Sequence, residues 1–314
     1  CVGQGVAFHP QWRDEECAVR STRSLLAMAR QTQRRLHILH VTTADELPLL
    51  AAHKDLVTCE VCPQHLTLFA PERYEALGTL AQMNPPIRDL RHQAALWEGV
   101  TGGLFDVLGS DHAPHTLEEK AKPWPTSPSG MPGVQTLVPL MLHHVNAGRL
   151  SLERFVDLSS AGPARAFGMR RKGRLALGYD ADFTLVDLSA ERTITQAWCK
   201  SRCGWTPFDG MRVTGWPMAT IVRGNVVMRD GTLQGSTAGQ HRGPAAGGSL
   251  VDGEYETSGA RAHVCRSSLL CQNQLSPERR APEARRPFPR CPKPQPIDES
   301  APSRWRNRPS NAPR

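Results

Sequence analysis

The sequence predicts an α/β protein with a parallel sheet, followed by a small β module. Short apolar runs alternate with segments of helical periodicity, and polar residues follow directly after the runs. Such alternation is typical of βαβ units, whose strands pair in parallel. From about residue 172 the pattern changes to short strands separated by Gly and Asp turns, and the end of the chain is rich in Pro, Arg, Ser and Gly. We therefore expect three regions: a βα part, a small β module and a disordered tail, at 1–171, 172–235 and 236–314.

The individual elements follow from periodicity and from capping residues. Thr43 precedes an apolar helical segment and has Glu46 three residues later, which is the pattern of a capping box. Ser151 stands in the same place before "LERFVDLSS". The expected strands are 36–41, 55–62 and 104–110, and the expected helices are 11–35, 43–54, 91–100, 133–148 and 151–160.

The charge of the chain is concentrated at its end. The net charge is +8, but residues 241–314 contain 13 Lys and Arg against 7 Asp and Glu, which leaves 25 against 23 in residues 1–240. No basic patch with interleaved aromatic residues is visible in that larger part, so we expect no nucleic-acid binding. No apolar run approaches the roughly 18 residues of a membrane span, and no signal peptide is visible. Nine cysteines without a disulfide rhythm indicate a reduced, cytoplasmic protein.

The segment "GSDHAPHTLEEK" contains the most suggestive residues. Asp111 follows an apolar strand, where a carboxylate can bind a metal or accept a proton from an activated water. His115 could supply a metal ligand, an acid or a contact to an anion. His40 and Glu60 end the other two expected strands. A solvated loop around Asp111, or a core histidine at His40, is the simpler alternative for each residue taken alone.

Two turns and one cysteine pair complete the candidates. In "MNPPIRD" two prolines stiffen the backbone, so that Asn84 can present its amide in a fixed direction. The turn "SPSGMPG", with Ser129 and Gly130, could offer backbone N–H groups to an anion. Both segments could equally be plain loops. Cys59 and Cys62 have CxxC spacing, but without a second pair at zinc-ribbon distance we expect them to be packing residues.

Taken together, these motifs resemble class I dihydroorotases of the amidohydrolase superfamily. "HILHVTT", "CEVCPQHLTLF", "MNPPIRD", "GSDHAPHTLEEK", "SPSGMPGVQT" and "KGRLALGYDADFTLVDL" occur in that family's order, over residues 10–235. The resemblance implies the C-terminal portion of a (β/α)₈ TIM barrel with a small β module. It also implies an enzyme with two Zn²⁺ ions, which reversibly hydrolyses L-dihydroorotate to N-carbamoyl-L-aspartate.

The resemblance also implies roles for individual residues. Asp111 would be the catalytic acid and base and a ligand of one zinc ion, and His40 would be a ligand of the other. Asn84 and His115 would bind the substrate, His115 near its carboxylate, and Ser129 and Gly130 would add backbone contacts. Glu60 matches a glutamate that binds a further zinc ion in some animal members. The cysteine that accompanies that ion is replaced here by Leu39, so we do not expect the further zinc.

The sequence also departs from the family pattern. The family's His-x-His motif, its bridging lysine or aspartate and a further histidine precede the matched motifs, and none of them is found in this sequence. We therefore expect the N-terminal part of the barrel to be missing and the isolated chain to be inactive and only weakly cooperative in folding. Three strands would leave two open sheet edges, and two ligands are too few to hold a pair of zinc ions.

Two other functions remain open. One is a hydantoinase-type or allantoinase-type cyclic amidohydrolase, against which His115 argues because it suits a substrate carboxylate that hydantoins lack. The other is a non-catalytic subunit that supports aspartate transcarbamoylase, as some family members without zinc ligands do. A homo-oligomer is possible in either case.

Overall fold

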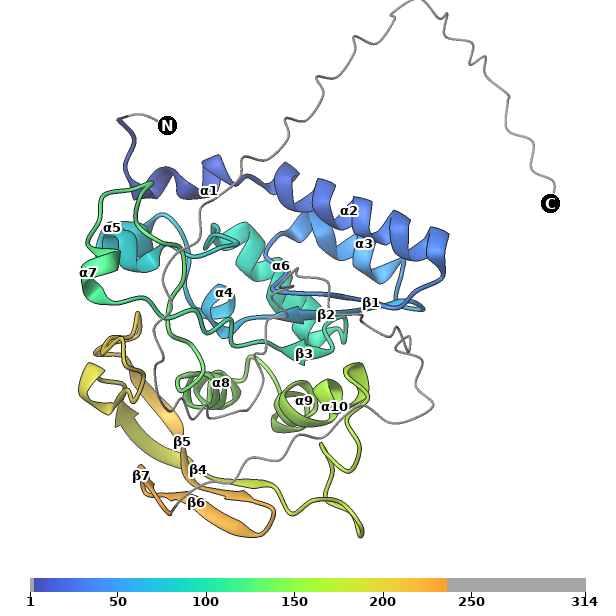
Figure 1. Ribbon diagram of the computed structural model, residues 1–314, viewed down its shortest axis with the longest axis vertical. Helices are drawn as coiled ribbons and strands as arrows, with labels where there is room; N and C mark the ends of the chain where they lie inside the picture. The colour runs from blue at the N-terminus through green and yellow to red at the C-terminus, as the bar shows by residue number, and fades with distance from the viewer. Residues whose placement is uncertain (1–2, 236–314) are drawn as a thin grey trace, which may run out of the picture. The chain divides into compact units, whose positions relative to one another are not determined.

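Residues 3–235 are described by the computed structural model, and the expected disorder of residues 236–314 lies outside these described residues. Two sheets are present (Figure 1). The first is parallel, in the order β1 (Leu36–Ile38), β2 (Val57–Val61) and β3 (Val107–Leu108). The second is antiparallel, in the order β4 (Phe183–Thr193), β5 (Arg212–Val222), β6 (Asn225–Arg229) and β7 (Thr232–Leu233).

The parallel sheet confirms the mixed α/β class and all three expected strands. Leu36 pairs with Val57, and Val61 pairs with Leu108. All three strands are shorter than expected. β1 and β3 end before His40 and Asp111, whose positive φ angles of 37° and 40° do not continue an extended strand. β2 and β3 also begin two and three residues later than expected. Within the described range this sheet is open, with β1 and β3 at its edges, and no closed barrel is formed.

Helices lie on both sides of the parallel sheet. In Figure 1, α2 and α3 lie on one side and α8, α9 and α10 on the other. The long helices are amphipathic or apolar, and the predicted caps are present: Thr43 and Glu46 form a capping box, and the Ser151 hydroxyl accepts from the Arg154 N–H. The α-helices are α1 (His9–Trp12), α2 (Glu15–Thr32), α3 (Leu47–Ala51), α4 (Pro63–Thr67), α5 (Glu72–Leu77), α6 (Leu90–Thr101), α7 (Leu117–Lys120), α8 (Leu137–Asn146), α9 (Leu152–Val156) and α10 (Gly162–Ala166). The 3₁₀ helices are η1 (Val6–Phe8), η2 (Ala44–Glu46), η3 (Gly78–Ala81) and η5 (Gln196–Trp198), and η4 (Asp157–Ala161) is a π-helical turn.

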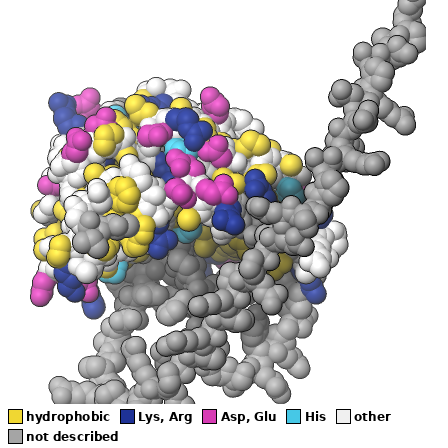
Figure 2. Space-filling model, turned by 90° about the horizontal axis from the view of Figure 1, so that it is seen from above, with side chains coloured by type: hydrophobic (Ala, Val, Ile, Leu, Met, Phe, Trp, Pro, Cys, Tyr) yellow, Lys and Arg dark blue, Asp and Glu magenta, His cyan; other side chains and the backbone are white. Residues whose placement is uncertain are grey.

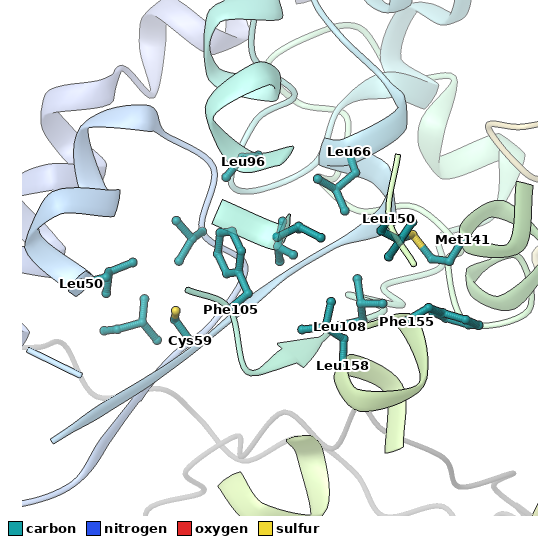
Figure 3. Close-up of a cluster of buried hydrophobic side chains, with 14 of the residues drawn as sticks. Leu50, Cys59, Leu66, Leu96, Phe105, Leu108, Met141, Leu150, Phe155 and Leu158 are labelled. Carbon is teal, nitrogen blue, oxygen red and sulfur yellow. The ribbon is translucent and has the colours of Figure 1, made fainter. Parts of the chain in front are cut away.

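Two clusters of buried apolar side chains hold these layers together. The first lies around the parallel sheet, where Leu50, Cys59, Leu108 and Met141 from helices and strands meet Phe105 from the loop before β3 (Figure 3). Burial of such side chains is the main favourable contribution to folding. Because this cluster surrounds the strands, it fixes the positions of their carboxyl ends.

The second cluster connects the loops beyond the strands to the antiparallel sheet. Met83, Met131 and Trp205 pack in it with Val213 of β5. Gly215, at a φ of 99°, lets β5 approach α8, since a Cβ atom there would lie 2.6 Å from the Leu142 Cβ. The two sheets are therefore linked by α8, and the boundary at 171/172 stays a prediction.

Two properties of the described part concern its helices and one face of its surface. No helix among residues 3–235 is long and apolar enough to cross a membrane. The face in Figure 2 has Lys and Arg interspersed with Asp and Glu. Cys59 and Cys62 are both buried.

Candidate functional site

The candidate site is built at the carboxyl ends of the three parallel strands. His40 follows β1, Glu60 lies in β2 and Asp111 follows β3. His40 and Asp111 are both non-glycine residues in the left-handed region of backbone conformation. Such backbone strain is uncommon and is concentrated at functional sites. The positions of these residues agree with the usual location of sites in parallel α/β folds.

Glu60 connects the three strand ends. Its carboxylate accepts a hydrogen bond from the His40 backbone N–H at 3.3 Å and one from His37 Nε2 at 3.2 Å. The Thr58 hydroxyl bonds His37 Nδ1 at 2.8 Å, which fixes the imidazole. On the other side, the carboxylate lies against Gly109, where a Cβ atom would be 2.5 Å from Glu60 Oε1. Glu60 thus holds the turn that carries His40 and the end of β3 that leads to Asp111.

Asp111 is electrostatically linked to both neighbours. Burial raises the pKa of its carboxyl group, the charge of His40 opposes this effect, and the charge of Glu60 adds to it. A carboxyl group whose pKa is raised toward neutrality is better suited to accept and return a proton. Asp111 therefore lies within electrostatic range of His40 and Glu60 at the carboxyl ends of the strands.

Asn84 has a partner that the sequence did not suggest. His9, fully buried in α1, donates from Nε2 to Asn84 Oδ1 at 3.1 Å and to the Met83 carbonyl at 3.0 Å. The amide oxygen is thereby occupied, and the Asn84 NH₂ group is the end available to donate. A lone histidine next to "PQW" carries no recognisable signal, which is why its role was missed.

The turn with Asn84 is connected to His40 through a second buried histidine. His65 Nε2 donates to the Pro85 carbonyl at 3.1 Å. Burial lowers the pKa of His65 to about 3, and the charge of nearby His40 contributes. His65 is thus a neutral, buried partner of the turn that carries Asn84.

The turn Ser129–Gly130 lies against the loop that carries His115. Gly130 has a φ of 141°, and a Cβ atom there would lie 2.5 Å from the Ala113 carbonyl oxygen and 3.2 Å from His115 Cδ2. The Ala113 N–H donates to the Met131 carbonyl at 3.1 Å. The His115 imidazole, about one third exposed, lies 3.5 Å from the Glu119 carboxylate. The two expected substrate-binding segments are therefore in contact.

Two further residues brace this turn and were not anticipated. Gln82 Nε2 donates to the Ser127 carbonyl at 2.9 Å and to Ser129 Oγ at 3.1 Å. Lys120 Nζ donates to the carbonyls of Gln82 and Pro128, both at 2.9 Å. Gln82 and Lys120 look in the sequence like ordinary surface residues of a loop and a short helix, and no local pattern distinguishes them.

The donors of the described part do not fit a two-zinc centre by themselves. His40 and Asp111 are the available candidates, because the carboxylate of Glu60 already accepts from His37 and from the His40 backbone. Among residues 3–235 no group of three or more His, Cys, Asp or Glu side chains is placed to hold a metal ion. A stable zinc site usually has at least three protein ligands.

Comparison with known proteins identifies the family of the chain. The model of the amidohydrolase family matches residues 22–227. A dihydroorotase from Halobacterium salinarum is 43% identical over 198 residues, covering 63% of this chain and 46% of that protein. An L-hydantoinase from Paenarthrobacter aurescens is 36% identical over 235 residues, which cover 72% of this chain and 50% of that protein. The chain thus spans about half the length of the curated relatives it matches.

The solved structures show the same relationship. The L-hydantoinase (dihydropyrimidinase) from Arthrobacter aurescens superimposes with a TM-score of 0.66 at 36% identity, covering 68% of this chain and 49% of that one. The dihydropyrimidinase from Brevibacillus agri gives a TM-score of 0.70 at 29% identity, covering 73% and 52%.

Proposed function

The chain belongs to the amidohydrolase family, and we propose that it carries the proton-transfer and substrate-binding part of a dihydroorotase site. The observation that supports this most directly is the position of Asp111 at the end of β3, beside His40 and Glu60. The similarity to dihydroorotases supports the same activity. The proposed reaction is the reversible hydrolysis of L-dihydroorotate to N-carbamoyl-L-aspartate, in the cytoplasm.

In this proposal Asp111 performs the proton transfers. Water adds its oxygen to the ring carbonyl carbon, the C–N bond of the ring breaks, and Asp111 carries the water's proton to the leaving amide nitrogen. The raised pKa of Asp111 suits a group that must both accept and release this proton. One water is consumed: one of its hydrogens ends on the amide nitrogen, and the other leaves as a proton from the new carboxyl group at neutral pH.

The remaining candidates would bind the substrate. Asn84, whose amide oxygen is occupied by His9, would donate from its NH₂ group to a ring carbonyl. His115 and the Ser129–Gly130 turn would receive the carboxylate. His40 and Asp111 stay the candidate zinc ligands, although these two do not complete a two-zinc centre within the described part of the chain.

Two alternatives are favoured by specific observations. Hydantoinase activity is suggested by the L-hydantoinase relative and by the solved hydantoinase structures. A non-catalytic subunit that supports aspartate transcarbamoylase would be consistent with the small number of metal ligands. Co-purification with the transcarbamoylase would support that second alternative, and absence of a complex would exclude it.

The test is ring opening by the purified chain with added Zn²⁺, alone and after co-expression with the N-terminal half of a dihydroorotase relative. We expect no turnover alone and turnover of L-dihydroorotate with the added half. Asp111→Asn should abolish turnover, whereas Asp55→Asn on the exposed surface should not. Faster opening of hydantoin or allantoin than of L-dihydroorotate would contradict the assignment. Asp111-dependent turnover by the chain alone would show that its own ligands suffice.

A further inference from the structure

Lys120 is a buried cation without an acidic partner. Lys120 is the last residue of α7 and is only 1% exposed. Its ammonium group donates to two backbone carbonyls, those of Gln82 and Pro128. No carboxylate forms an ion pair with it anywhere in residues 3–235. Burying an unpaired charge is costly, so a structural brace alone would be served better by a neutral side chain.

The ammonium group lies directly behind the Ser129–Gly130 turn. The Gln82 carbonyl that it binds also accepts from the Gly130 N–H at 2.9 Å, and the other carbonyl belongs to Pro128, the residue before Ser129. Ala113 and His115 also lie against this turn, next to Gly130. One hydrogen-bonded carbonyl, that of Gln82, therefore separates the Lys120 ammonium group from the turn proposed to receive the substrate carboxylate.

We propose that Lys120 is a specificity-determining residue, whose buried charge makes the subsite formed by His115 and the Ser129–Gly130 turn selective for a carboxylate-bearing ring over a neutral one. This inference rests on the proposed function and specifies its substrate class. Lys120 acts through its field and not by contact, since its N–H groups are directed at protein carbonyls. In a poorly solvated interior such a field is only weakly screened.

The surroundings of Lys120 give this charge a pH dependence. Burial lowers the pKa of Lys120 to about 8. Burial lowers the pKa of His9 on α1, and the charge of Lys120 makes a small further contribution, so its field extends to the partner of Asn84. The other titratable groups near the turn are His115 and Glu119, which lie at the surface and face each other. Anion selectivity should thus be present at pH 7 and decline as pH rises through about 8.

The experiment compares two ligands that differ only in the carboxylate, L-dihydroorotate and 5,6-dihydrouracil, by calorimetric titration of the full chain. Lys120→Met should weaken L-dihydroorotate binding at pH 7 by about tenfold and change dihydrouracil binding less than about twofold. Lys122→Met, an exposed lysine nearby, is the matched control and should change neither. In the wild type, affinity for L-dihydroorotate should approach that of Lys120→Met at pH 9.5.

The outcomes separate this inference from the proposed function. If Lys120→Met weakens the binding of both ligands equally, or of neither, the charge of Lys120 does not determine selectivity. The wild-type pH series needs no variant, so it decides the matter even if Lys120→Met does not fold, and a flat series would overturn the inference. If malonate binds in a Lys120-dependent manner while L-dihydroorotate does not bind, the charge is supported and the proposed function fails. If no anion binds the wild type, the inference is wrong.

Discussion

Gly109 lies so close to Glu60 that no larger residue fits at its position. A Cβ atom at this position would lie 2.5 Å from Glu60 Oε1 and 2.7 Å from its Cδ. The carboxylate would have to move, and it would weaken its hydrogen bonds with His37 and the His40 backbone. We expect Gly109→Ala to lower the free energy of unfolding by about 2 kcal/mol, as overpacking of a buried site does, in urea denaturation.

The cause can be isolated with a double-mutant cycle. If the collision with Glu60 is responsible, Gly109→Ala should cost much less in a Glu60→Ala background, because the colliding carboxylate is absent. Gly5→Ala serves as the control, since nothing lies within 4 Å of a Cβ atom there. Its effect should stay within about 0.5 kcal/mol. Additive costs for Gly109 and Glu60 would exclude the steric explanation.

At the scale of elements, two capping boxes of the same kind differ in burial. In the first, Glu46 accepts from the Thr43 N–H and hydroxyl and also from the Thr22 hydroxyl of α2, at 2.7 Å, in a buried position. In the second, Glu119 accepts from the exposed Thr116 N–H. Glu46→Ala leaves buried donors without a partner and should cost about 2–3 kcal/mol, whereas Glu119→Ala should cost under about 1 kcal/mol. Chemical denaturation of both variants tests this, and equal costs would contradict it.

The same elements show how far the sequence could be interpreted. Apolar runs and the Thr43 and Ser151 caps are local signals, so the three parallel strands and the helices α2, α3, α6, α8 and α9 could be predicted. The short helices α4, α5, α7 and α10, of four to six residues, were not expected. The convergence of His40, Glu60 and Asp111 followed from the rule that parallel strands place their carboxyl ends together. The contacts of His9 with Asn84 and of Lys120 with Gln82 join residues 75 and 38 positions apart, and no local pattern encodes them.

At the scale of the whole molecule, stability should depend on pH through a buried histidine. Burial lowers the pKa of His144 from 6.5 to about 3. Between pH 3 and 6.5 the unfolded chain therefore binds more protons than the folded one, and stability falls as pH falls through that window, by up to about 1.4 kcal/mol per pH unit. His144→Gln, which can keep a hydrogen bond to Thr67, should flatten this slope in urea titrations between pH 7 and 5. If the slope of stability against pH is unchanged in His144→Gln, groups other than His144 cause it.

The open parallel sheet determines how cooperatively the chain should unfold. In the described region β1 and β3 each pair only with β2, so both outer edges have backbone groups without strand partners, and Leu39 beyond β1 is exposed. Such edges favour loose packing and self-association. We expect a broad heat transition whose calorimetric enthalpy differs from its van't Hoff enthalpy, because unfolding is not two-state. We also expect a sedimentation coefficient that depends on protein concentration. Adding the N-terminal half of a dihydroorotase relative should sharpen the transition by pairing both edges. A sharp two-state melt of the chain alone, independent of concentration, would mean that the three-stranded sheet is stable without further strands.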